Sequence, residues 1–169
     1  MDMHPTSRRR AAAALPLALA AAGAGLCVSA SPASAETAQH RQARIADAMG
    51  IAANQKGDPY AYGADGPNRF DCSGLVFFAT HRAGFSHVPR SSSAQAAHMN
   101  RIPRSHLRRG DFLFFYNGDA TASNVYHVGV FAGWDNGHRM MVDAPNSGER
   151  VKREPLWSHQ WFAGTLRGL

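Results

Sequence analysis

The sequence has few cysteines and no long run of basic residues. Only two of the 169 residues are cysteine, Cys27 and Cys72, and aromatic residues make up 9% of the chain. No Lys/Arg-rich stretch is interleaved with aromatic residues, so nucleic-acid binding is not expected. The histidines show no H-E-x-x-H motif and no paired Cys/His spacing, so neither a metal site nor another cofactor is expected.

Linkers, repeats and low-complexity tracts are also missing from the interior of the chain. With 44% hydrophobic residues, a chain of this length suits one domain with one core. The N-terminus differs, because Arg8, Arg9 and Arg10 precede an Ala/Leu-rich apolar run over residues 11–28. Ala33-Ser34-Ala35 then forms a small-residue cleavage site of the A-x-A kind. Residues 1–35 are therefore predicted to be a secretory signal peptide, and an uncleaved membrane anchor is the alternative.

Signal cleavage would leave a domain of residues 36–169 that is secreted or held at the cell wall, with no stable membrane association. Ser7-Arg8-Arg9 is only part of a twin-arginine signal, so the Sec or Tat route is left open. The remaining 15 basic and 11 acidic residues carry a formal charge of +4. This charge favours anionic wall polymers as partners, although a mildly basic surface without a partner fits equally well. A monomer is expected.

Periodicity divides the mature chain into helices followed by strands. A helix is predicted over residues 38–55, a second from Cys72 to about Gly84, and a third near Ser92, where Ser92 and Gln95 resemble a capping box. Five short apolar or alternating segments then predict strands, over residues 112–116, 127–133, 139–143, 151–153 and 161–166. This order indicates an α+β fold in which N-terminal helices pack on an antiparallel sheet of about five strands.

Cys72 is a candidate nucleophile because it opens an amphipathic helix. Asp71 directly before it is a good N-cap residue, and the positive end of the helix dipole favours a thiolate at this position. Because glycine has no side chain, we expect Gly74 to leave open space beside the Cys72 sulfur. Taken alone, one unpaired cysteine in an oxidising compartment fits a buried inert thiol better than a reactive one.

Two further residues could serve such a thiolate. His127 begins a predicted strand, and Asp135-Asn136-Gly137 predicts a hairpin turn after it. If the turn centres on Asn136, position 143 faces position 128 to within one or two residues, so Asp143 should lie near His127. A carboxylate at the ring would fix its tautomer and orientation. A surface histidine and a strand-ending aspartate are the structural alternatives.

These residues occur in six sequence blocks whose order and spacing resemble the NlpC family of cell-wall cysteine peptidases. The blocks are Pro59-Tyr60-Ala61-Tyr62-Gly63, Phe70-Asp71-Cys72-Ser73-Gly74-Leu75-Val76, Pro89-Arg90-Ser91-Ser92, Arg109-Gly110-Asp111-Phe112, His127-Val128-Gly129-Val130 and Asp143-Ala144-Pro145. The resemblance runs from about Arg44 to Leu166. It implies a papain-like core and hydrolysis of peptidoglycan stem peptides, commonly at the bond between γ-D-glutamate and the diamino acid.

Residue by residue, the resemblance assigns Cys72 as nucleophile, His127 as base and Asp143 as the residue that orients His127. Histidine, or sometimes Asn or Gln, is usual at this third position, so Asp143 is a departure from the family. Tyr60 matches a family tyrosine near the nucleophile that helps the oxyanion or the substrate amine, although a core aromatic fits this position equally well. We group Asp71 and Ser73 with Tyr60 as residues that bind substrate or the oxyanion.

Three other functions fit the same sequence. An N-acetylmuramoyl-L-alanine amidase would use the same Cys/His chemistry on a neighbouring bond. Acyl transfer to an amine would share the first half of the reaction. A non-catalytic wall-binding module on the same fold would need neither Cys72 nor His127.

Overall fold

The computed structural model describes residues 32–168, with side chains from Thr37 onward. The predicted signal peptide falls almost wholly on residues 1–31, outside the described part, and stays a prediction. Three α-helices come first, and the rest of the described chain holds six strands and two short 3-10 helices, Arg104–His106 and Ala122–Asn124. The helices are α1 (Pro32–Asn54), α2 (Cys72–Arg82) and α3 (Ser92–His98). Within the described residues, no helix is both long and apolar enough to cross a membrane.

The strands form a single antiparallel sheet in the order β1-β6-β2-β3-β4-β5. They are β1 (Asn100–Ile102), β2 (Phe112–Tyr116), β3 (Val125–Asp135), β4 (His138–Asp143), β5 (Lys152–Pro155) and β6 (Trp161–Thr165). The predicted α+β architecture is confirmed, with one strand more than expected. The additional strand, β1, has only three residues and pairs with the edge of β6, so it lacks the apolar alternation that reveals a strand.

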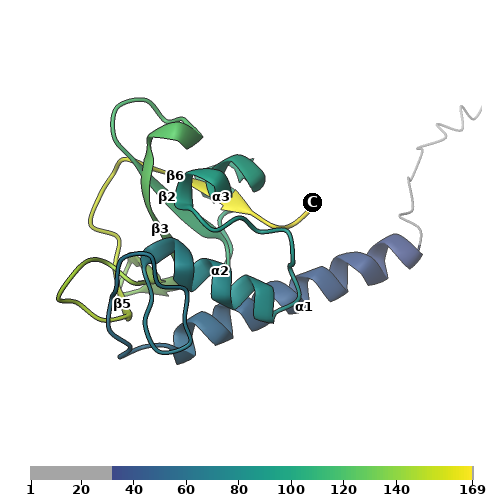
Figure 1. The fold of residues 1–169 in the computed structure, drawn as a ribbon. Helices are drawn as coiled ribbons and strands as arrows, with labels where there is room; N and C mark the ends of the chain where they lie inside the picture. Colours follow the sequence, from purple (N-terminus) through teal and green to yellow (C-terminus); the bar gives the residue numbers. More distant parts are fainter. Residues whose placement is uncertain (1–31, 169) are drawn as a thin grey trace, which may run out of the picture. The chain divides into compact units, whose positions relative to one another are not determined.

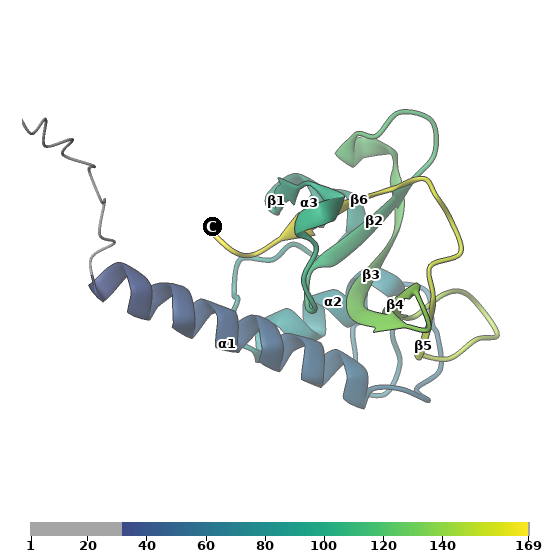
Figure 2. The same ribbon diagram turned by 180° about the vertical axis from the view of Figure 1, so that it is seen from behind.

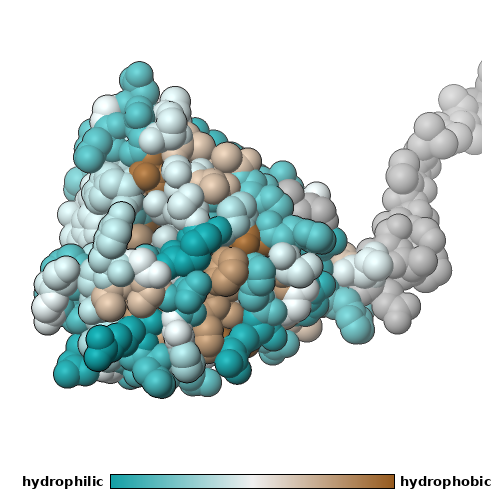
Figure 3. Space-filling model, viewed as in Figure 1, coloured by the Kyte–Doolittle hydropathy of each residue, from teal (hydrophilic) through white to brown (hydrophobic). Residues whose placement is uncertain are grey.

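Both faces of the sheet are covered, which explains why the central strand β2 is buried along almost its whole length. On one face, Phe112 and Phe114 join the main core with residues of α1 and α2 such as Ile45 and Leu75. On the other face, Leu113 belongs to a smaller cluster. Helices α1 and α2 lie side by side (Figures 1 and 2). Seen from the side of Figure 1, the surface is mostly hydrophilic with small hydrophobic groups (Figure 3), because the helices turn their apolar faces inward.

The β3–β4 hairpin contains the predicted turn and an irregularity that the sequence does not reveal. Asn136 and Gly137 both have positive φ, 47° and 81°, as a type I′ turn requires. Asp135 pairs with His138, but the register shifts between Phe131 and Gly133, so Val130 pairs with Val142. The extra residue in β3 is a β-bulge. Continuing this register places position 143 opposite position 129, one residue from the predicted partner.

Candidate active site

Cys72 is the first residue of α2, as predicted, and the backbone before it is extended. The predicted N-cap is confirmed, because an Asp71 carboxylate oxygen accepts a 2.6 Å hydrogen bond from the Gly74 N–H. The thiol is free and partly exposed. Its sulfur therefore stands at the positive end of the helix, where the dipole favours a negative charge.

The Asp71 side chain forms a closed polar cluster with Arg90 and Ser73. Arg90 donates two hydrogen bonds of 3.0 and 2.9 Å to the two carboxylate oxygens, and the Ser73 hydroxyl donates a third of 3.1 Å. Burial alone would raise the pKa of Asp71, but the bonds from Arg90, the Gly74 N–H and Ser73 outweigh it and lower the pKa. The carboxylate consequently remains ionised and ties the start of α2 to the segment before α3.

This cluster gives Asp71 and Ser73, which we grouped with the substrate-binding residues, a visible structural role. Both residues are buried, and neither lines the cleft that contains Cys72. Their hydrogen-bonding groups are directed to each other and to Arg90, so they hold the start of the helix in place. Arg90 stood in one of the family-like blocks, but its role as the partner of Asp71 could not be read from sequence.

Gly74 and the start of α3 also differ from expectation. A Cβ atom at Gly74 would lie 2.1 Å from the Ala64 carbonyl oxygen and 2.9 Å from an Arg90 nitrogen, so glycine allows a close backbone approach and does not open space at the sulfur.

Helix α3 is capped by Ser91, whose hydroxyl accepts from the Ala94 N–H. The predicted capping box at Ser92 is therefore wrong. The Gln95 side chain instead donates to the Ser73 carbonyl.

His127 and Asp143 are hydrogen-bonded in the structure. The distance between His127 Nε2 and Asp143 Oδ2 is 2.9 Å, and the two side chains are 6% and 0% exposed. The bulge explains the contact, because residues directly opposite in an antiparallel pair face the same side of a sheet, as do residues two apart in one strand. Asp143 opposite Gly129 therefore shares a face with His127. Because Nε2 is hydrogen-bonded to Asp143, Nδ1 is the ring nitrogen that can exchange a proton with Cys72.

Electrostatics favour a protonated imidazole. Burial of His127 lowers its pKa, but hydrogen bonds from the ring to Asp143 and Cys72 outweigh burial and raise the pKa to about 9. Burial raises the pKa of Asp143, and the contact with His127 opposes that change. The Asp143 oxygen that does not contact His127 is buried with no hydrogen-bond partner among the described residues. The carboxylate is thus committed to the ring.

Cys72 and His127 both line a cleft of about 540 Å³. Tyr60 lies in its wall, held through its backbone N–H by the Glu149 carbonyl at 2.9 Å. Burial, followed by the nearby Cys72 and Asp71, raises the pKa of Tyr60, so its hydroxyl stays a hydrogen-bond donor. The complete set of lining residues is Tyr60, Cys72, Tyr126, His127, Pro145, Asn146, Lys152, Glu154 and Trp157.

The wall of the cleft beside His127 comes from β5 and the segment after it, and sequence reasoning missed it. The Trp157 ring stacks on Phe115 at 4.3 Å and lies 5.5 Å from the His127 ring. Its indole N–H donates to Glu154 at 3.2 Å, and Glu154 pairs with Lys152 at 3.1 Å. Pairing of β5 with β4 places Lys152 opposite Asp143. Strand β5 was predicted, but its neighbour in the sheet could not be.

Comparison with known proteins finds relatives that are named as endopeptidases. A probable endopeptidase of Corynebacterium glutamicum is 39% identical over 129 residues, which cover 76% of this chain and 55% of that protein. The chain thus spans about half the length of this curated relative.

Solved structures with a similar fold include the P60 domain of an antigen from M. avium subspecies paratuberculosis, with a TM-score of 0.64 and 27% identity over 78% of this chain and 99% of that one. The NlpC/p60 domain of the peptidoglycan hydrolase SagA matches with a TM-score of 0.62 and 26% identity, covering 72% and 98%. The predicted papain-like fold is confirmed by these matches. The family model described as NlpC/P60 matches residues 57–168, and the chain therefore belongs to the NlpC/P60 family.

Proposed function

We propose that the protein is a cysteine peptidase that hydrolyses the stem peptides of peptidoglycan. The observation that carries this proposal is the position of His127, whose ring is hydrogen-bonded to Asp143 and lies with Cys72 at the wall of an open cleft, close enough for the two to influence the pKa of the ring. A nucleophile, a base and a group that orients the base are the parts that covalent acyl transfer requires. A binding module would need none of these three side chains in this arrangement.

In the first half of the reaction, the Cys72 thiolate attacks the carbonyl carbon of the scissile amide. The negative charge that develops on the carbonyl oxygen is stabilised by the backbone N–H of Cys72, at the start of α2, and by the Tyr60 hydroxyl. The protonated His127 then gives its Nδ1 proton to the leaving nitrogen as the C–N bond breaks. An amine leaves, and the acyl group stays on Cys72 as a thioester.

In the second half, water replaces the amine. His127, now neutral, takes a proton from the water as its oxygen attacks the thioester carbonyl. The C–S bond breaks, the thiolate returns, and a carboxylic acid leaves. Throughout both halves Asp143 accepts a hydrogen bond from Nε2, which keeps Nδ1 directed toward the sulfur and the substrate.

The substrate class is supported by the family and by the charges of the cleft. Both an ammonium and a carboxylate group line it, from Lys152 and Glu154, which suits a peptide bearing charges of both signs. SagA, with a similar fold, is described as a peptidoglycan hydrolase. We propose the bond between γ-D-glutamate and the diamino acid as the one cleaved. The amidase alternative uses the same chemistry but releases intact stem peptides.

Purified cell wall digested with the protein tests the proposal. The wild type should release truncated stem peptides, identified by mass spectrometry, and Cys72→Ala should release none, because alanine preserves the helix start and removes only the nucleophile. Iodoacetamide should inactivate the wild type, whereas EDTA should not.

Three results would contradict the proposal in different ways. Full activity of a folded Cys72→Ala protein would exclude a cysteine nucleophile. Release of intact stem peptides would identify an amidase. No release by a wild type whose thiol reacts with iodoacetamide would favour a wall-binding module. Circular dichroism of both proteins controls for folding.

A further inference from the structure

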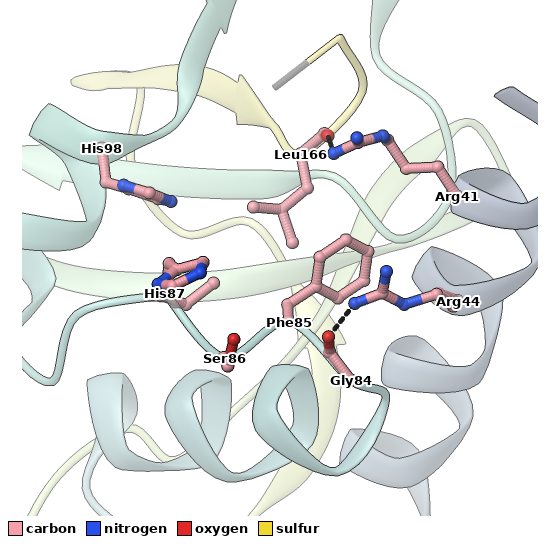
Figure 4. Close-up of a pocket in the computed structure, with 9 residues that line it drawn as sticks. Arg41, Arg44, Gly84, Phe85, Ser86, His87, His98 and Leu166 are labelled. Atoms are coloured by element: carbon pink, nitrogen blue, oxygen red, sulfur yellow. Dashed lines mark hydrogen bonds between the residues drawn. The ribbon is translucent and has the colours of Figure 1, made fainter. Parts of the chain in front are cut away.

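A second pocket, separate from the catalytic cleft, has a volume of about 630 Å³. It is formed by α1, by the segment after α2, by the end of α3 and by Leu166 after β6, and it shares no lining residue with the cleft (Figure 4). Its lining residues are Arg41, Arg44, Gly84, Phe85, Ser86, His87, Val88, His98 and Leu166. No aspartate or glutamate is among them.

Two arginines on one side of α1 give this pocket its charge. Arg41 and Arg44 are three residues apart, so they project from the same helix face, and both are partly buried. Among the described residues, neither is within ion-pair distance of a carboxylate, whereas the partly buried Arg90 and Arg167 each have an aspartate. No carboxylate lines the pocket to neutralise the two guanidinium groups, so the pocket carries a positive charge that an anionic ligand would complement.

The two arginines differ in how much of each guanidinium remains available. Arg44 stacks on the Phe85 ring at 4.0 Å, donates from Nε to the Ala83 carbonyl at 2.9 Å and donates from Nη2 to the Gly84 carbonyl (Figure 4). Most of its guanidinium is therefore used to cap the end of α2. Within the described part of the chain, Arg41 has only one hydrogen bond, a long one of 3.5 Å from Nη1 to the Leu166 carbonyl. Most of the Arg41 donors therefore remain free for a ligand, in the fork geometry that suits oxyanions.

The shape of the pocket indicates the kind of anion. In Figure 4 the two arginines lie on one side of Phe85 and Leu166, and His87 and His98 lie on the other. The buried Phe85 and Leu166 form an apolar floor between the two sets of polar groups. A small inorganic ion would leave this floor uncovered. A polymer in which oxyanions alternate with uncharged linking groups would contact both sides and the floor.

We propose that this pocket binds an anionic polymer, with an oxyanion at Arg41 and Arg44 and the next uncharged unit over Phe85 and Leu166. Oxyanions that alternate with uncharged linking units are the chemistry of phosphodiester-linked polymers, so the expected ligand is a phosphodiester-linked polymer of the cell wall, a setting that rests on the function proposed above. The site does not depend on the catalytic residues. It would hold the protein on its polymer while the separate cleft cleaves peptides.

Co-sedimentation with purified walls tests the site, using the full chain with Cys72→Ala so that the walls stay intact. Arg41→Glu reverses the charge of the pocket arginine that makes fewer contacts. Arg109→Glu makes the same charge change at an exposed arginine outside the pocket. We expect Arg41→Glu to weaken wall binding about tenfold, the effect of losing a hydrogen bond to a charged group. Arg109→Glu should change it less than about twofold, in line with exposed charges.

Walls stripped of phosphodiester polymers by acid distinguish the two sources. The difference between the two variants should disappear on stripped walls, because the phosphodiester polymer is gone. If it persists, the ligand is a peptidoglycan carboxylate and the proposed polymer is wrong. Equal binding by the two variants on both kinds of wall would overturn the proposal. In the Cys72 background, Arg41→Glu should cleave a soluble stem peptide at the wild-type rate, which also shows that the variant folds.

Discussion

At the scale of single residues, the most informative feature is the buried pair of His127 and Asp143. A carboxylate that is fully buried costs free energy unless it is paired, and here its one hydrogen-bond partner among the described residues is an imidazole. The pair therefore stabilises the protonated ring, and the pKa of His127 is raised from 6.5 to about 9. Protonated His127 is the form that our mechanism requires when the amine leaves.

This pairing predicts the effect of removing the carboxylate. Asp143→Ala should lower kcat by about 10- to 10⁴-fold, because the ring loses the group that fixes its tautomer and orientation. KM should change less, since Asp143 lies outside the cleft lining. The wild-type rate should fall as the pH rises through about 9, where His127 loses its proton. In Asp143→Ala the basic limb of the pH–rate profile should move to lower pH, because the variant lacks the hydrogen bond and the negative charge that raise the pKa of His127.

Asp143→Asn separates the two effects of Asp143, which are to orient the His127 ring and to place a negative charge beside it. Asparagine keeps an acceptor for the Nε2 proton, so it should retain more of kcat than alanine while still shifting the basic limb downward. Kinetics across pH 5–10 with a soluble stem peptide measure both effects. Near wild-type kcat and an unmoved basic limb in Asp143→Ala would mean that Asp143 only ends a strand.

At the scale of elements, the start of α2 is fixed by the loop before it. The Asp71 N–H donates to the Ala64 carbonyl at 2.8 Å, and the Gly63 N–H donates to the Asp71 carboxylate at 2.9 Å. Arg90 also donates to the Ala64 carbonyl, at 3.0 Å. These bonds press the Ala64 backbone against Gly74, in the first turn of the helix that carries Cys72. The position of the nucleophile thus depends on a close approach between two backbone segments.

Gly74→Ala should disturb this contact strongly. The new methyl group would meet the Ala64 oxygen at 2.1 Å, and backbone cannot yield as a flexible side chain does. We expect a loss of stability of about 2 kcal/mol or more and little remaining activity, since a displacement of about 1 Å at a catalytic group can cost about 10²-fold. Gly50→Ala in α1 is the matched control, because nothing lies within 4 Å of its added methyl group. Thermal denaturation should show it unchanged or more stable.

At the scale of the whole molecule, the cleft and the basic pocket have separate lining residues on one domain. Helix α1 supplies both arginines of the pocket, while the cleft is made by the start of α2 and by β3, β5 and neighbouring segments. We propose that this domain is exported, is held at the wall as a monomer and acts there on peptidoglycan. The proposal rests on the N-terminal signal pattern and on the polymers that the two sites suit.

Export makes a direct prediction about the mature chain. Signal peptidase should cleave after Ala35, because Ala33 and Ala35 provide the small side chains that the enzyme accepts. N-terminal sequencing of secreted protein should therefore begin at Glu36. Ala35→Leu should block processing, and Ala38→Leu, beyond the cleavage site, should not. Retention of residues 1–35 in a membrane fraction of the wild type would instead indicate an anchor.

The sequence by itself determined the helices, most of the strands and the cap before Cys72, because these depend on interactions between residues close in the chain. It also identified the family, from blocks whose spacing reflects one fold. The short strand β1 and the wall of Lys152, Glu154 and Trp157 escaped prediction, because they take their places only through neighbours far away in sequence.

The contact between His127 and Asp143 shows what only the tertiary structure decided. The turn pairs Asp135 with His138, and without a bulge this register would set Asp143 opposite Val130, on the face away from His127. The one extra residue of β3 between Phe131 and Gly133 moves Asp143 opposite Gly129 and onto the face of His127. A bulge of one residue leaves no clear mark in the sequence, yet it determines which side of the sheet every later residue of β4 faces.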